Sequence, residues 1–239
     1  MNQERKKKTI IPEFYRDLKK SNTHPALYYF SFRKSSKNSK KPIPTPDNLP
    51  HKIDFKWDQI FDSTGHIEIE IGSGKGGFLC EYSKNHPEIQ LLGSEWDKSW
   101  ALFALRRWMQ KKHHDNVNML CGDMFYFVRD AVPDHSVNAY HMYFPDPWPK
   151  EKHHKNRLLK ADFVKEVART LKPGKRHFYW ATDHQEYNEE ALSVFDAFPK
   201  CTIIERNSAS PTEGIMTGFE KKYIQEGRPI YRSIIVFDK

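Results

Sequence analysis

The feature that most constrains the fold is an alternating apolar segment that runs directly into a glycine-rich turn. Residues His66–Ile71 read HIEIEI, which places three isoleucines on one face and predicts a strand. Gly72–Gly77 follows at once, and Phe78–Asn85 has the pattern of a helix. A strand, a glycine turn and a helix in this order typically open a ligand-binding, doubly wound α/β sheet.

The rest of the chain continues to alternate between strand-like and helix-like segments. Further strands are expected at 89–94, 117–121, 136–144 and 175–181, and a closing pair at 201–207 and 229–237. Helices are expected at 98–112, 158–171 and 186–198. The sequence therefore predicts a Rossmann-like α/β fold: a mostly parallel seven-stranded sheet with helices on both faces and an antiparallel C-terminal strand pair.

A basic arm precedes this domain. Residues 1–41 hold 12 Lys/Arg and 3 Asp/Glu, whereas the rest hold 27 and 28, so the net charge of +8 comes from the arm. Residues 34–50 are rich in Ser, Lys and Pro, as linkers are. We divide the chain into a basic, partly disordered arm and linker at 1–50 and a folded α/β domain at 51–239. Cations interleaved with aromatics suit a nucleic acid, although a solvated tail or a docked arm has the same composition.

Composition excludes several other classes of protein. Only 38% of the residues are hydrophobic, and no apolar run reaches 18 residues, so no membrane span is expected. Basic residues near the start have no apolar segment behind them, which favours a cytoplasmic protein. Cys80, Cys121 and Cys201 are widely separated and predict reduced thiols instead of a zinc site.

Acidic residues end each of the first three predicted strands. Glu70 immediately precedes the glycines and would repel a pyrophosphate, whereas it suits a ligand with cationic groups. S-adenosylmethionine carries a sulfonium and an ammonium and no phosphate, so the charges favour it. Each acid alone could be a helix cap or a surface charge. As a set, the expected cofactor contacts are Glu70, the turn glycines Gly72, Gly74 and Gly76, Glu95 toward the ribose, and Asp123 toward the adenine amino group.

The fourth predicted strand ends in FPDPWPK, residues 144–150. Its three prolines make a rigid backbone that projects Asp146 from the sheet edge. A cationic patch suited to phosphates follows, made of Lys150, Lys152, His153, His154, Lys155 and Arg157. The paired histidines would suit a metal, but no acid or cysteine nearby in the sequence completes a ligand set, so no metal is expected.

These residues resemble a known family. FPDPWPK, with HHKNRL behind it, is similar to the motif of the bacterial tRNA (guanine-N7-)-methyltransferases, as are Ala181-Thr182-Asp183 and the segment Thr217–Glu220. The resemblance runs from about residue 67 to residue 235 in the family's order. Gly218 stands where the family usually has a basic residue, and Gly93-Ser94-Glu95 stands where it usually reads Gly-Ile-Glu.

The resemblance implies a class I methyltransferase that uses S-adenosylmethionine, releases S-adenosylhomocysteine, and methylates guanine N7 in the variable loop of tRNA. It implies that four acids contact the cofactor or line its pocket, namely Glu70, Glu95, Asp123 and Asp146. Implied substrate contacts are Lys150, Asp183, Thr217, Gly218, Phe219 and Glu220, to which the charge pattern adds Arg157 as a phosphate contact.

Guanine N7 carries a lone pair and no proton, so its methylation needs positioning and no general base. The product ring is cationic, and we expect Asp146 to stabilise that charge as the catalytic residue. Three alternatives stay open: a small heterocyclic substrate for the same cofactor, a non-catalytic RNA-binding protein on this scaffold, and a nicotinamide-dependent oxidoreductase. Glu70 and the placed carboxylates disfavour the last two. A monomer and a homodimer are both compatible with the sequence.

Overall fold

The computed structural model describes residues 19–20, 27–30, 55–110, 116–174, 176–208 and 210–238. Most of the predicted arm and linker at 1–50 lies outside these ranges, so its boundary and its role toward RNA stay predictions. Among the described residues, no helix is both long enough and apolar enough to cross a membrane.

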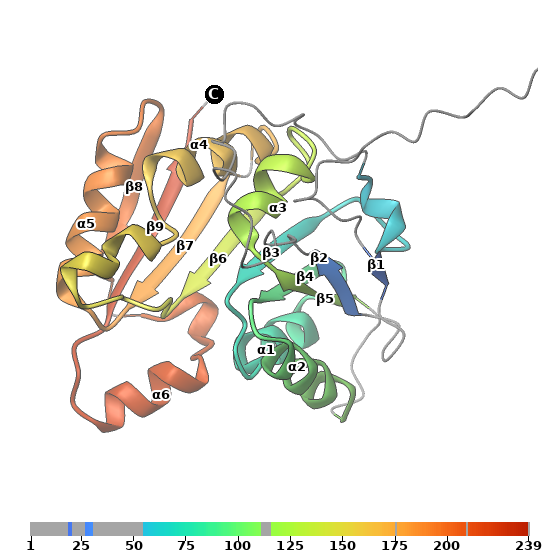
Figure 1. Ribbon diagram of the computed structural model, residues 1–239, viewed down its shortest axis with the longest axis horizontal. Coiled ribbons are helices and arrows are strands. Elements are labelled where there is room, and N and C mark those ends of the chain that lie inside the picture. The colour runs from blue at the N-terminus through green and yellow to red at the C-terminus, as the bar shows by residue number, and fades with distance from the viewer. Residues whose placement is uncertain are drawn as a thin grey trace, which may run out of the picture.

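The described residues form one twisted sheet in the order β1-β2-β5-β4-β3-β6-β7-β9-β8 (Figure 1). The five central strands pair in parallel, β9 pairs antiparallel with β7 and β8, and β2 adds to the edge of β5 in parallel. The predicted seven strands and the antiparallel closing pair are confirmed. Their bounds are β3 Ile67–Ile71, β4 Gln90–Glu95, β5 Val117–Gly122, β6 Ala139–Tyr143, β7 His177–Thr182, β8 Cys201–Arg206 and β9 Tyr231–Phe237, preceded by β1 Lys19–Lys20 and β2 Leu27–Phe30.

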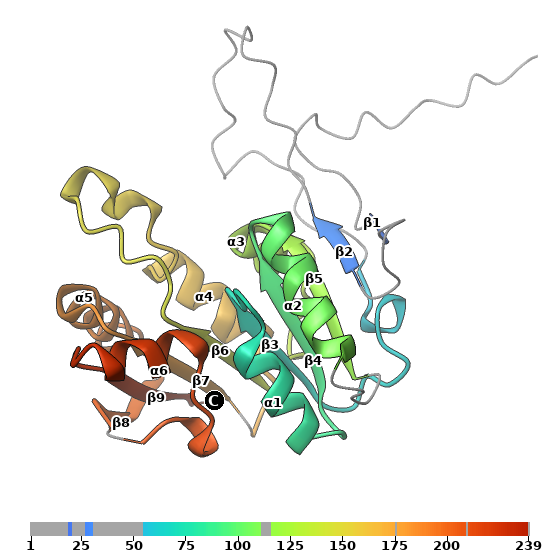
Figure 2. The ribbon, with the colours of Figure 1, turned by 90° about the horizontal axis from the view of Figure 1, so that it is seen from below.

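Helices cover both faces of the sheet, as predicted. Figure 2 shows α1 (Gly77–Asn85) and α6 (Gly218–Gln225) on one side, and α4 (Ala161–Thr170) and α5 (Gln185–Asp196) on the other. Helix α2 (Lys98–Gln110) packs with α1, whereas α3 (Met124–Asp130) packs with α4. Helices α3 and α6 were not predicted from sequence, and no structure was assigned to the segment that forms the 3-10 helix η3 (Glu151–Asn156).

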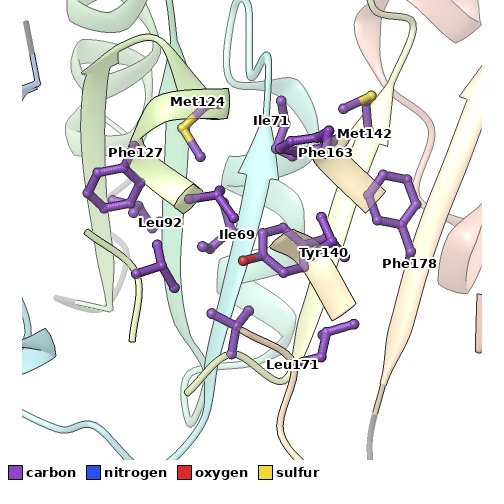
Figure 3. Packing of buried hydrophobic residues seen from close by; sticks show 14 of the residues in the cluster. Ile69, Ile71, Leu92, Met124, Phe127, Tyr140, Met142, Phe163, Leu171 and Phe178 are labelled. Atoms are coloured by element: carbon purple, nitrogen blue, oxygen red, sulfur yellow. The ribbon is translucent and has the colours of Figure 1, made fainter. Parts of the chain in front are cut away.

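The larger core lies between the sheet and α3, α4 and α5. Figure 3 shows Ile69 and Ile71 of β3 packed with Tyr140 and Met142 of β6 and with Phe163 of α4. The isoleucines of the alternating strand therefore point to this face, as the pattern predicts. The intervening Glu68 and Glu70 do not face solvent, because α1 and the strands beside β3 bury them at 5% and 3% exposure.

The strand order changes direction at β3. It pairs in parallel with β4 on one side and with β6 on the other, so that Glu70 is level with Gly93 and His141. The chain leaves β4 toward β5 and leaves β6 toward β7, which opens a crevice at the carboxyl ends of these strands. The glycine turn lies at this edge, and the candidate site is built around it.

Candidate active site

The glycine turn is tied to its neighbours by its own backbone. The amides of Gly72 and Ser73 donate to the Ser94 carbonyl at 3.0 and 2.8 Å, and the Gly74 amide donates to Glu95 Oε2 at 2.9 Å. Gly76 has a φ of 66° and sits directly on α2, where a Cβ atom would come within 2.9 Å of the Ala104 Cβ. A side chain at 76 would displace α2, so the close packing explains the glycine.

Glu70 is a buried carboxylate with one oxygen, Oε2, that has no hydrogen-bond partner among the described residues. Burial, together with the negative charge of Glu95, raises the pKa of Glu70 to about 7. An unsatisfied acceptor at 3% exposure is costly unless a ligand supplies a donor. An ammonium group supplies hydrogen-bond donors as well as a positive charge, so the structure fits the cationic ligand that the sequence predicts at this position.

Glu95 and Asp123 end the next two strands at the same edge. Glu95 accepts from the amides of Gly74 and Trp96, both at 2.9 Å, and stays partly exposed. Asp123 caps α3 by accepting from the Phe125 amide at 2.9 Å, and burial raises its pKa. The cap function that the sequence left open for Asp123 is thus present. A carboxylate has a second oxygen, so capping does not exclude a ligand contact.

Asp146 lies where β6 gives way to the proline-rich segment. The backbone at Phe144 and at Trp148 has positive φ values, 53° and 46°, which turn the chain sharply on either side of the acid. The Asp146 side chain is exposed, as is that of Lys150. Both side chains are therefore open to solvent, and their expected contacts with cofactor and substrate stay predictions.

Arg157 does not lie where a phosphate contact requires. It is 2% exposed, its Nε donates to the Pro147 carbonyl at 2.8 Å, and its guanidinium lies 4.8 Å over the Tyr187 ring. It also pairs with Glu186 and Glu190 of α5. A cation enclosed by two carboxylates and a carbonyl has little left for RNA. Here the structure departs from the expected phosphate contact: Arg157 fastens the FPDPWPK segment to α5.

A small cluster lies beside η3, in which one ring nitrogen of His154 and one carboxylate oxygen each of Glu186 and Glu190 lie within 4.8 Å of one another. The expectation that no acid lies near the paired histidines is wrong, because α5 brings two. The Arg157 guanidinium occupies this cluster, however, with Nη2 3.0 Å from His154 Nε2 and 3.2 Å from Glu186. The cation already balances these carboxylates, so the cluster does not make a case for a metal site.

The predicted substrate contact Asp183 belongs to a cluster beside Asp146 whose other members, Arg228 and Tyr223, were not predicted from sequence. Asp183, which follows β7, accepts from Arg228 Nη1 at 2.9 Å, and the Arg228 guanidinium lies 4.6 Å over the Tyr223 ring. Tyr223 packs edge-on against Phe144 with ring centroids 5.5 Å apart. Burial raises the pKa of Tyr223, and the charges of Asp183 and Asp146 also contribute. The last turn of α6 thus brings an aromatic ring to the acids at the ends of β6 and β7.

Residues Thr217–Glu220 form the start of α6. Thr217 Oγ1 accepts from the Glu220 amide at 3.0 Å, and the Glu220 carboxylate accepts from the Thr217 amide at 3.2 Å. Both side chains are buried, and Glu220 also pairs with Arg232 of β9. Threonine followed three residues later by glutamate is the signature of a capping box, which the sequence contained. Thr217 and Glu220 therefore have a structural role in starting α6, and their expected contacts with substrate stay predictions.

Gly218 and Phe219 lie against the glycine turn. A Cβ atom on Gly77 would come within 3.3 Å of the Gly218 amide nitrogen, and one on Gly74 within 3.6 Å of the Phe219 ring. Gly218 is exposed, and Phe219 is 47% exposed. Helix α6 therefore forms a wall that borders both the turn and the Asp146–Asp183 edge.

A buried polar chain runs from β3 to the segment before α6. Glu68 accepts from Tyr82 and contacts His141 Nε2, and Tyr143 joins His141 Nδ1 to Thr212. Burial would raise the pKa of Glu68, but hydrogen bonds from His141, His66 and Tyr82 outweigh it and hold that pKa below its usual range. A cavity of about 240 Å³, lined by Tyr143, Tyr179 and Arg232 among others, lies at the end of this chain.

Comparison with known proteins gives a consistent result. A family model described as "Putative methyltransferase" matches residues 64–233. The tRNA (guanine-N(7)-)-methyltransferase of Alkalilimnicola ehrlichii is 33% identical over 176 residues, which cover 73% of each chain. The tRNA (guanine-N(7)-)-methyltransferase of Enterococcus faecalis is 35% identical over 189 residues, which cover 77% of this chain and 86% of the relative.

Solved structures agree in fold. The 16S rRNA methyltransferase KamB has a TM-score of 0.57 at 13% identity, over 78% of this chain and 96% of that one. A putative methyltransferase from Thermoplasma acidophilum has a TM-score of 0.50 at 16% identity, over 73% of this chain and 69% of that one. At these identities the likeness shows the Rossmann-like fold alone.

Proposed function

The chain belongs to the tRNA (guanine-N(7)-)-methyltransferase family, and from this premise we propose that it transfers a methyl group from S-adenosylmethionine to N7 of a guanine in the variable loop of tRNA. The observation that carries the assignment to this site is the row of carboxylates at the ends of adjacent strands. Glu70 and Glu95 adjoin the glycine turn, Asp123 follows β5 on the far side of β4, and Asp146 follows β6 on the other side of β3.

Glu70 would hold the cationic part of the cofactor, because its buried Oε2 needs a donor. Glu95 would accept from the ribose hydroxyls and Asp123 from the adenine amino group, while Gly72, Gly74 and Gly76 let the backbone come close. S-adenosylmethionine supplies the methyl group as an electrophile. No second cofactor and no metal enter this proposal.

On the substrate side, the protein's task is to position a base that needs no deprotonation. Asp146 would lie beside the guanine ring and stabilise the positive charge that the ring gains when the N7–methyl bond forms. Lys150 would hold a phosphate near the base, and Asp183 would accept from guanine N–H donors. Gly218 and Phe219 would border the bound base, since α6 adjoins both halves of the site.

The deciding experiment is methyl transfer from radiolabelled S-adenosylmethionine to unmodified tRNA transcripts, with products mapped by cleavage at N7-methylguanine. We expect label at one variable-loop guanine, and none in a transcript whose guanine at that position is replaced by adenine. Binding of the cofactor with unlabelled tRNA would overturn the RNA substrate in favour of a small heterocycle. Binding of tRNA without the cofactor would indicate a non-catalytic RNA-binding protein.

Two further properties follow from the proposed reaction. A protein that modifies tRNA works where tRNA is made and used, so we propose a cytoplasmic location. The site is assembled within one chain, from residues of β3 to α6, so it would operate in a monomer and in a homodimer alike.

A further inference from the structure

Helix α2 exposes aromatic and cationic side chains along one face. Trp100 and Phe103 are 44% and 47% exposed, and their rings meet edge-on with centroids 6.1 Å apart. Arg106 is exposed and Arg107 partly so, and helical periodicity places both on the same side as Phe103. Between Lys98 and Gln110 the helix contains no acidic residue. We refer to Trp100, Phe103, Arg106 and Arg107, with Lys75, as the α2 face.

The α2 face is continuous with the cofactor-binding turn. Lys75, in the middle of the turn, places its ammonium 5.4 Å over the Trp100 ring, and Arg107 Nη1 lies 3.4 Å from the Lys75 carbonyl. Close packing of Gly76 on Ala104 fixes the helix against the turn. A molecule that contacts the α2 face therefore lies next to the cofactor site.

The α2 face and the two acids on the substrate side, Asp146 and Asp183 (the acceptor acids), lie on opposite sides of the glycine turn. Helix α2 follows β4 and lies over β4 and β5, whereas Asp146 and Asp183 follow β6 and β7 (Figure 1). A small substrate bound at the acids would not reach α2. A folded RNA whose guanine lies at Asp146 extends well beyond one base, and it can span both sides.

We propose that the α2 face binds the tRNA substrate, with Trp100 and Phe103 stacking on exposed loop bases and the cations contacting adjacent phosphates. This inference rests on the proposed function and names a second contact surface for its substrate. Exposed indole and phenyl rings are unfavourable in water unless a partner covers them. RNA loops offer unstacked bases and phosphates together, which matches rings interleaved with positive charge and an absence of acids on the helix.

The test compares two variants of the full chain with a matched control. W100A/F103A removes the rings and keeps every cation, whereas M109A removes a side chain that is 52% exposed on the same helix and turned away from both rings, about 180° around the helix axis from Trp100 and about 120° from Phe103. We expect W100A/F103A to raise the tRNA Kd about tenfold. The Kd for S-adenosylmethionine and kcat at saturating tRNA should stay at wild-type values, and M109A should behave as wild type throughout.

Salt dependence separates stacking from charge. The slope of log Kd against log salt should be unchanged in W100A/F103A, and it should fall by about 2 in R106A/R107A, because two phosphate contacts are lost. A wild-type protein that methylates tRNA while W100A/F103A keeps its Kd overturns this inference alone. So does a change of oligomeric state in W100A/F103A with unchanged RNA affinity, which would make the face a contact between copies. A wild-type protein that neither binds nor methylates tRNA removes the proposed function as well.

Discussion

Arg228 donates from Nη1 to Asp183 Oδ2 at 2.9 Å and joins the end of α6 to the end of β7. Arg228 is 46% exposed and Asp183 is 16% exposed, so the pair lies at the rim of the site. Exposed ion pairs contribute little to stability. The consequence of this pair should therefore appear in substrate binding, where it orients the Asp183 carboxylate.

We expect R228A and D183N each to lower kcat/KM for tRNA, R228A by about tenfold. The double variant should lose less than the two single losses combined, because both changes remove one arrangement. Steady-state kinetics on the four proteins measure this coupling, and thermal unfolding should give the same Tm for all four. Full activity in R228A, or additive losses, would contradict the role given to this pair.

Replacement of Asp146 should separate chemistry from cofactor binding. D146A should lower kcat by about 100-fold or more, because the cationic product ring loses its neighbouring carboxylate. The Kd for S-adenosylmethionine should change by no more than about threefold. D146N keeps the shape and the hydrogen-bond acceptor, and it should be nearly as slow as D146A, since the charge is what matters. A D146A enzyme with near-normal kcat would remove Asp146 from catalysis.

Glu70 should make stability depend on pH. Its pKa is raised to about 7 in the folded chain from an ordinary value of 4.5. Between these pH values the folded protein binds a proton that the unfolded chain has released. The free energy of unfolding therefore falls as pH rises through this window, by about 3 kcal/mol without ligand. Urea denaturation at pH 5 and pH 8 measures this decrease in the free energy of unfolding. E70Q should not show it, whereas the control E151Q, at an exposed position, should show it as the wild type does.

Cofactor affinity should show the opposite dependence on pH. A cationic ligand favours the ionised form of Glu70, so binding of S-adenosylmethionine should tighten as pH rises through about 7. Titration calorimetry from pH 6 to pH 8 measures this. An affinity that is flat over that range would mean that Glu70 does not meet a positive group.

Arg157 should matter for folding more than for RNA. R157A removes the buried partner of the Pro147 carbonyl and of two carboxylates that are 55% and 35% exposed, and it should lower the free energy of unfolding by about 1–3 kcal/mol. K155A, at an exposed position in η3, should change it by less than about 0.5 kcal/mol. If R157A unfolds like wild type and only reduces the salt dependence of tRNA binding, the phosphate contact expected from sequence would be correct after all.

Close packing at the glycine turn can be measured with two glycines of similar conformation. Gly76 and Gly227 have φ values of 66° and 68°, but only the first has atoms near its missing Cβ. G227A should cost about 1 kcal/mol of backbone strain. G76A should cost about 1–3 kcal/mol more, because its methyl group meets Ala104. If G76A and G227A lose the same free energy of unfolding in urea denaturation, α2 moves aside freely.

Much of the fold was predictable because hydrophobic periodicity is strong where strands and helices bury one continuous face. The segment Ile67–Ile71 is an example, and its position before the glycines also predicted the crevice. Helix α3 was missed because its sequence MFYFVRD is short and rich in aromatics, which favour strands. Helix α6 was missed because GFEKKYIQ has few apolar residues and is held by its capping box.

The site was predictable only as far as residue type and strand order determine position. Acids that follow parallel strands must meet at one edge, so Glu70, Glu95, Asp123 and Asp146 could be grouped from sequence. Arg157 could not be placed, because a basic run looks solvated until α5 is seen to supply Glu186 and Glu190. Likewise, the contact between Arg228 and Asp183 joins residues 45 positions apart and depends on where α6 ends.

Helix α6 borders both the glycine turn and the acceptor acids, with Phe219 beside Gly74 and Tyr223 beside Phe144. One element would thus border both proposed binding sites, and their affinities would be linked through any change in α6 that both ligands favour. A cofactor that orders α6 would lower the entropic cost of binding the RNA. By reciprocity, bound RNA would raise the affinity for the cofactor. After methyl transfer, release of either product would weaken the binding of the other. The two products would therefore leave together, with α6 as the element that couples their release.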